Sequence, residues 1–133
     1  GMVAGIMIFL FLSLSFVLHE FSHAYMYTKV RETEKSPLLC SSFSKLSILY
    51  PSVNIKKDAI IAFSGPLTPF ILGVLILGGY FVLWMFSTNV NFALGIAISS
   101  MFIIHGMFLL PLFKDGKSLF KYLFINKLRR DVA

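Results

Sequence analysis

The sequence predicts an all-α polytopic membrane protein with three transmembrane helices, a short cytoplasmic strand or hairpin segment and a C-terminal interfacial helix. The 133 residues are 57% hydrophobic and 16% aromatic, with a mean hydropathy of +0.83, which is too apolar for a soluble domain. Long stretches without charge can cross the hydrocarbon core of a bilayer, and the basic residues gather outside them. We therefore expect one membrane-embedded unit, 1–133.

The first predicted span covers about residues 2–28, because residues 2–18 carry no charge. It lacks the basic start and the small-residue cleavage pattern of a signal peptide. The run 59–113 is also uncharged and is long enough for two more spans of roughly 20 residues each. We expect these spans at about 59–86 and 90–113.

The basic residues predict how the chain is oriented. Six Lys and Arg residues lie in the predicted loop 29–58 and six in the predicted tail 114–133. Because basic loops stay on the cytoplasmic side, we expect loop and tail in the cytoplasm and the N-terminus outside. The net charge of +6 then reflects topology and attraction to anionic lipid, and we predict no nucleic-acid partner. The single Cys40 excludes an intrachain disulfide and fits a reducing compartment.

Two shorter elements complete the expected fold. Residues 46–53 alternate partly between apolar and polar and are predicted to form a strand. Such a strand either pairs with an extended substrate or only covers a site beside it. Residues 117–130 mix Leu and Phe with basic residues, which is typical of an interfacial helix on the cytoplasmic leaflet.

A candidate metal-binding pattern, H-E-F-S-H, occupies residues 19–23 inside the predicted first span. In a helix His19 and His23 share one face at the spacing that binds Zn²⁺, and Glu20 lies beside them to act as a base on a metal-bound water. A carboxylate inside a span costs about 2.5 to 3.5 kcal/mol on insertion scales, so it is retained where it pairs, coordinates or reacts. The alternative is a polar cluster that only hydrogen-bonds neighbouring helices.

A catalytic zinc ion commonly takes a third protein ligand. The candidates are Glu32, Glu34, Asp58, His105, Asp115 and Asp131. Asp115 is the best, because the chain can break between Pro111 and Gly116 and turn a carboxylate inward; the alternative is an Asp that starts a helix. On a regular helix His105 would lie about 15 Å from Asp115, so we interpret it as a hydrogen-bonding histidine.

Gly65, Pro66 and Pro69 lie at about the same depth in the second span as the two histidines do in the first. Proline and glycine at this depth free backbone carbonyls and bend a helix, which is tolerated where the backbone lines a wet cavity or packs on protein. A plain kink or close helix packing is the alternative.

These residues resemble the site-2 proteases, a family of intramembrane zinc metalloproteases. Leu18–Ala24 is similar to the family's metal-binding helix, Phe63–Leu67 to its central Gly-Pro element and Leu110–Gly116 to its L-D-G element. The order and approximate spacing of the three elements agree across nearly the whole chain.

The resemblance implies a core of three helices in which His19, His23 and Asp115 hold one Zn²⁺ and Glu20 activates water. It also implies a membrane-anchored substrate that is cleaved within or near its transmembrane helix.

The sequence departs from the family pattern at three places. Pro69 stands where family members often carry an Asn, no Asn precedes the L-D-G element, and Lys114 replaces an apolar residue. These departures concern substrate handling more than metal binding. They leave a second hypothesis, a catalytically weak relative that binds membrane helices as an adaptor. A metal carrier is a third, and it is disfavoured because only Ser13 and Ser15 are polar between Val3 and Val17.

Overall fold

The computed structural model describes residues 2–31, 35–42, 45–49, 51, 53–87 and 89–131. Along the chain its elements are α1 (Met2–Val30), β1 (Leu38–Ser42), β2 (Lys45–Leu49), α2 (Ile55–Phe86), α3 (Phe92–Ile103), the 3-10 helix η1 (Ile104–Leu109) and α4 (Lys114–Asp131). Three helical segments are long and apolar enough to cross a membrane, namely Gly5–Val30, Ile55–Phe86 and Phe92–Leu109. The predicted number and order of apolar spans are confirmed.

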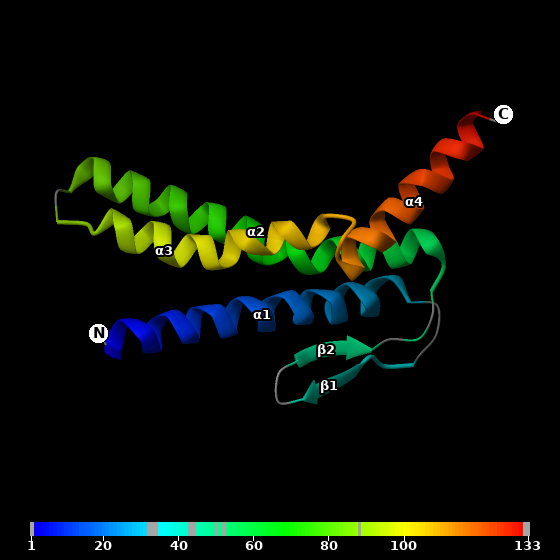
Figure 1. Cartoon of the computed structure of the whole chain (residues 1–133), viewed down its shortest axis with the longest axis horizontal. Coiled ribbons are helices and arrows are strands. Elements are labelled where there is room, and N and C mark those ends of the chain that lie inside the picture. Colours follow the sequence, from blue (N-terminus) through cyan, green and yellow to red (C-terminus); the bar gives the residue numbers. More distant parts are fainter. Residues whose placement is uncertain are drawn as a thin grey trace.

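The three apolar helices lie side by side along the long axis of the molecule (Figure 1). The N-terminus and the turn between α2 and α3 lie at one end. The hairpin, the C-terminal end of α1 and the start of α4 lie toward the other end, and α4 leaves the bundle at an angle. Helix α2 packs against α1, α3 and α4 and is therefore the centre of the fold.

Asparagines cap two of the helices. The side chain of Asn54 accepts a hydrogen bond from the backbone N–H of Lys57 at 2.9 Å, so α2 begins at Ile55 rather than near residue 59 as predicted. Asn91 caps α3 in the same way through the N–H of Leu94 at 3.1 Å. Helix α2 continues through Pro66 and Pro69 without interruption.

The third span differs most from expectation. Helix α3 is α-helical only to Ile103, and η1 then winds more tightly to Leu109. Leu110 is extended, with φ −68° and ψ 148°, and α4 starts at Lys114. The span expected at about 90–113 is thus helical only to Leu109, and the chain turns ahead of Asp115 as expected.

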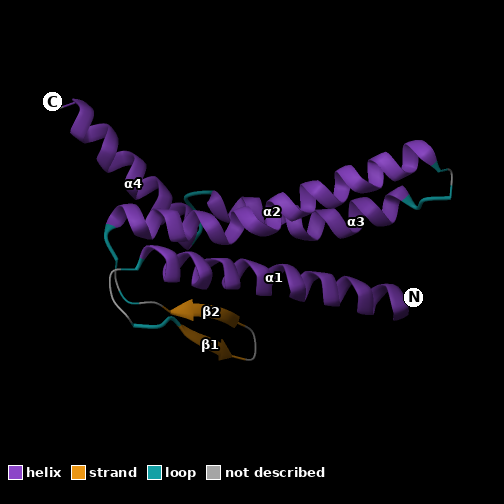
Figure 2. Cartoon of the chain, turned by 180° about the vertical axis from the view of Figure 1, so that it is seen from behind, coloured by secondary structure: helices purple, strands orange, loops and turns teal. Residues whose placement is uncertain are grey.

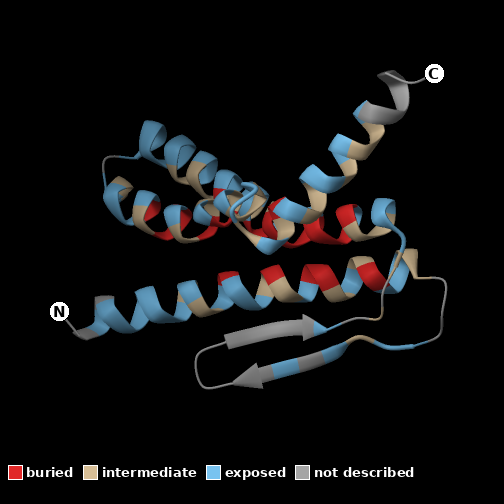
Figure 3. Ribbon diagram, turned by 45° about the vertical axis from the view of Figure 1, so that its right-hand side comes forward, coloured by how far each residue is buried: buried red, intermediate tan, exposed pale blue. Residues whose placement is uncertain are grey.

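Buried residues lie mainly in the middle of the helical bundle, and much of the rest of each helix is exposed (Figure 3). Many large apolar side chains are exposed, whereas several polar side chains are buried. Phe9, Phe86 and Leu112 are 70%, 86% and 78% exposed, respectively, although burying such side chains is what stabilises a soluble fold. Among the residues whose burial is described, the buried polar side chains are Ser15, His19, Ser22, His23, Ser64, Ser99 and His105. Since uncompensated burial of polar groups is costly, each needs a specific partner.

Strands β1 and β2 form an antiparallel hairpin in which Leu38 pairs with Leu49 and Ser42 with Lys45. The hairpin lies beside α1, on the side away from α2 and α3 (Figure 2). Of the predicted strand 46–53, residues 46–49 are in β2, and Tyr50 and Ser52 lie outside the described residues. The buried Tyr27 donates a hydrogen bond to the backbone oxygen of Lys35 at 3.0 Å, which ties the start of this segment to α1.

Candidate metal centre

Three side chains from the two ends of the chain converge inside the bundle. The Nε2 atoms of His19 and His23 lie 3.1 Å apart, and Oδ2 of Asp115 lies 3.2 Å from the first and 3.4 Å from the second. All three side chains are largely shielded, with exposed fractions of 7%, 8% and 17% in that order. The structure thus brings together the two histidines of the helical pattern and the carboxylate selected as third ligand.

The spacing of these three atoms fits a zinc ion. Bonds of about 2.0–2.1 Å in a tetrahedral site separate neighbouring ligand atoms by about 3.3–3.4 Å. The three separations, 3.1, 3.2 and 3.4 Å, match such a triangle. Two imidazole nitrogens and one carboxylate oxygen are also a common donor set for catalytic zinc, in which the fourth position stays open to water.

The orientation of the His23 ring is set by α2. Its Nδ1 atom lies 2.8 Å from the backbone oxygen of Ile61, and a carbonyl only accepts, so Nδ1 carries the proton. Neutral His23 therefore presents a bare Nε2 lone pair toward the Asp115 carboxylate. Two acceptors at 3.4 Å are satisfied by a cation placed between them, either a proton or a metal ion.

Gly65 leaves room for this ring. A Cβ atom built on Gly65 would overlap Cε1 and Nε2 of His23. The glycine of the Gly-Pro element therefore allows α2 to approach the metal-binding face of α1. At Gly65 the structure therefore shows close packing of two helices, which the sequence analysis gave as an alternative for the Gly-Pro element.

Asp115 reaches the site from the first turn of α4. Gly116 next to it packs on the backbone of Leu110, with no space for a side chain, so the chain can double back at this point. Burial raises the pKa of Asp115, but hydrogen bonds and charge from His19 and His23 outweigh it and lower that pKa to about 2. Asp115 is therefore anionic at neutral pH.

Glu20 is half-buried on α1 next to His19, and its charge acts on His23. It does not belong to the three-ligand group. A carboxylate in this place, close to the ligands but not among them, suits a proton acceptor.

His105 lies beside the site but not in the ligand group. Its Nδ1 atom is 3.2 Å from Nδ1 of His19, on the opposite side of that ring from Asp115. Phe108 packs against both imidazoles, with ring centroids 5.4 Å from each. Both His105 and Asp115 contact His19, although on a regular helix they would lie about 15 Å apart.

Of the remaining candidate ligands, Asp58 alone has a side chain that the structure describes. Glu32 and Glu34 lie outside the described residues, and of Asp131 only the backbone is described. Asp58 lies in the first turn of α2 and is not part of the cluster.

Sequence reasoning missed Ser15 as a member of this polar face. Ser15 lies four residues before His19, which lies four before His23, and all three are buried. That spacing of four along an apolar helix was the available signal. The contacts of Gly65 and Ile61 with His23 had no local signal, because they depend on how two helices pack.

Comparison of the chain with protein-family models, with curated proteins and with solved structures finds no match. The resemblance to the site-2 proteases accordingly stays a prediction, based on three short elements of this sequence.

Proposed function

We propose that this protein is an intramembrane zinc metalloprotease. The observation that supports the proposal best is the triangle formed by His19 Nε2, His23 Nε2 and Asp115 Oδ2, with sides of 3.1 to 3.4 Å. Its size and donor types fit zinc, and the neutral tautomer of His23 leaves the lone pair that a metal requires.

A bound zinc ion would lower the pKa of a water molecule and polarise a peptide carbonyl. The residues of the chain would have separate roles in metal binding and in proton transfer. His19, His23 and Asp115 would hold the ion, and Glu20 would accept a proton from the water and pass it to the leaving amine. The ring of Phe108 packs against His19 and that of Phe16 against His105, and we expect both rings to restrict the access of water from their side.

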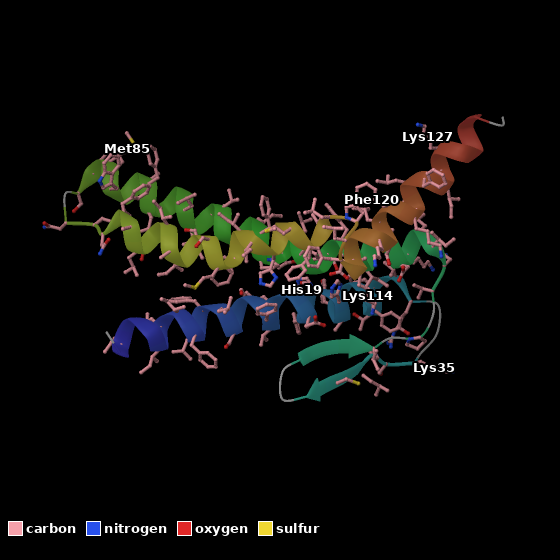
Figure 4. All side chains as sticks on the ribbon, viewed as in Figure 1. His19, Lys35, Met85, Lys114, Phe120 and Lys127 are labelled. Atoms are coloured by element: carbon pink, nitrogen blue, oxygen red, sulfur yellow. The ribbon has the colours of Figure 1, made fainter. Side chains whose placement is uncertain are left out.

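The membrane is part of the proposal. Exposed apolar side chains along α1, α2 and α3 suit a lipid environment, in which helices satisfy their own backbone hydrogen bonds. Lys35 and Lys127 lie toward one end of the molecule and Met85 at the other (Figure 4). Loop and tail therefore share one side, which we assign to the cytoplasm by the positive-inside rule.

The substrate would be a membrane-anchored protein cleaved within or near its transmembrane segment. In an intact helix every carbonyl is hydrogen-bonded and surrounded by side chains, so the segment has to unwind before hydrolysis. Hairpin β1–β2 is close to α1 and offers backbone groups to an extended chain.

The decisive experiment compares the wild type with Glu20→Gln in proteoliposomes that contain zinc and a panel of single-span test proteins. We expect both proteins to bind one zinc ion, and cleavage by the variant to be about 100- to 10,000-fold slower, the usual contribution of a general base. Equal cleavage by the two proteins, or none by either, would reject the protease proposal. In the second case, tight binding of test helices without turnover would favour the adaptor hypothesis.

A further inference from the structure

A chain of buried polar groups leads away from the candidate metal centre. Nδ1 of His19 meets Nδ1 of His105 at 3.2 Å, Nε2 of His105 meets the hydroxyl of Ser15 at 3.0 Å, and this hydroxyl donates to the backbone oxygen of Leu12 at 2.7 Å. Ser15 and His105 are fully buried, with 0% exposure. The chain joins residues 86 positions apart in sequence across α1 and η1.

The end of this chain fixes its direction. Ser15 has one hydroxyl proton, and it is directed at the Leu12 carbonyl, which can only accept. Toward His105 the Ser15 oxygen is therefore an acceptor, so Nε2 of His105 carries a proton. In neutral His105 the other nitrogen, Nδ1, is then bare and accepts.

The same logic extends to the metal ligand. Since Nδ1 of His105 accepts, Nδ1 of His19 is the donor, and the neutral His19 ring keeps its lone pair on Nε2. Nε2 is the atom that faces His23 and Asp115. The direction of the Ser15 hydroxyl hydrogen bond thus favours the His19 tautomer with a bare Nε2. This is the tautomer that a metal ligand requires.

From this arrangement we infer that His105 is a positioning residue: it accepts the Nδ1 proton of His19 and so holds the Nε2 lone pair of that ligand toward the metal. Ser15 accepts from Nε2 of His105 and thereby leaves Nδ1 of His105 free to accept from His19. This inference rests on the proposed function, because it assigns His105 a task only if the site holds zinc.

The ring of His105 is held in place for this task. Phe16 contacts it edge-on at a centroid distance of 4.8 Å, and Phe108 packs at 5.4 Å across both histidines. The 3-10 geometry of η1 carries His105 into this position. Outer partners of this kind typically change metal affinity by about 10- to 100-fold when they are removed.

Three substitutions of His105 separate hydrogen bonding from packing. In His105→Asn the side-chain oxygen takes the place of Nδ1 and can still accept from His19. In His105→Gln the amide reaches the place of Nε2 and loses that contact, and His105→Leu removes both. We expect zinc affinity, measured by chelator competition in detergent, to fall by about 10- to 100-fold in His105→Leu and His105→Gln and by clearly less in His105→Asn.

A spectroscopic measurement on the wild type needs no variant that might misfold. With ¹⁵N-labelled histidine and bound zinc, the nitrogen shifts should identify His105 as protonated at Nε2 and bare at Nδ1. In Ser15→Ala the preference for this tautomer should weaken, since the acceptor is gone. Unchanged nitrogen shifts of His105 in Ser15→Ala would show that Ser15 does not set this tautomer.

The outcomes distinguish the inference from the proposal on which it rests. Wild-type protein that binds no zinc overturns both. Zinc binding with unchanged affinity in His105→Leu, or equal losses in the Asn and Gln variants, overturns only the role of His105. A His105 ring protonated at Nδ1 in the zinc-loaded wild type does the same.

Discussion

The imidazole of His23 donates from Nδ1 to the backbone oxygen of Ile61 at 2.8 Å, and so links α1 to α2 across 38 residues of sequence. The contact does more than join two helices. Because it fixes which nitrogen carries the proton, it orients the lone pair that faces His19 and Asp115. A backbone carbonyl in the second span therefore controls a candidate ligand in the first.

Replacing Gly65 with Ala should disturb this contact. The new methyl group would overlap the His23 ring, and overpacking of this kind costs about 1–3 kcal/mol unless α2 moves away. We expect a loss of zinc affinity together with a lower unfolding temperature. Gly79→Ala is the matched control on the same helix, because no atom outside the local helix backbone lies within 4 Å of a Cβ at that position. Equal zinc affinity in the two variants would contradict the close approach at Gly65.

Removing a ligand should remove the metal. His23→Ala and Asp115→Ala each leave two of the three convergent donors, and we expect both to lose stoichiometric zinc in elemental analysis of the purified protein. Asp58→Ala serves as control, since this carboxylate lies outside the group. Full zinc content in Asp115→Ala would mean that another donor, such as His105 or water, completes the site.

Loss of the Tyr27 hydroxyl should loosen the segment that leads into the hairpin. Tyr27→Phe removes a donor to the oxygen of Lys35, worth about 1 kcal/mol, and leaves the 3.2 Å contact from Arg31. Trypsin should therefore cut after Lys35 faster than in the wild type. Tyr25→Phe is the control, because Tyr25 is exposed and lies on the same helix. Identical cleavage rates in both variants would show that the hydroxyl does not hold this segment.

The single cysteine offers a test of orientation. Cys40 is exposed on β1, in the loop between α1 and α2 that we assign to the cytoplasm. A membrane-impermeant maleimide should label it in inverted vesicles and not in right-side-out vesicles. In a Cys40→Ser, Ser87→Cys protein, the new thiol at the C-cap of α2 should show the opposite pattern. Labelling of both positions from the same side would refute the proposed topology.

Much of the fold could be predicted from the sequence, because each apolar run is long enough to identify a span on its own. Uncharged stretches located the three spans to within a few residues, and the spacing of His19 and His23 placed them on one helix face. The path after Ile103 was not readable. A switch from α-helical to 3-10 geometry leaves no signal in the composition of the segment, so the tighter winding of residues 104–109 could not be predicted.

The candidate metal ligands could be predicted from the sequence, whereas the residues that pack against them or hydrogen-bond to them could not. Asp115 could be chosen because few acidic residues compete and Pro111 and Gly116 flank it. Its contact with both histidines, the packing of Gly65 on His23 and the pairing of His105 with His19 all depend on how helices cross. No local pattern encodes such crossings, since apolar surfaces can pack in several ways.

The three candidate ligands come from α1 and from the start of α4, the first and last helices of the described chain. In the order of synthesis, His19 and His23 precede the two later apolar helices, and Asp115 follows them. A nascent chain that lacks α4 therefore carries two of the three candidate ligands, without the carboxylate that completes the group. The candidate metal centre can form only once the last of the described helices has been added, so metal binding at this site would report assembly of the whole bundle.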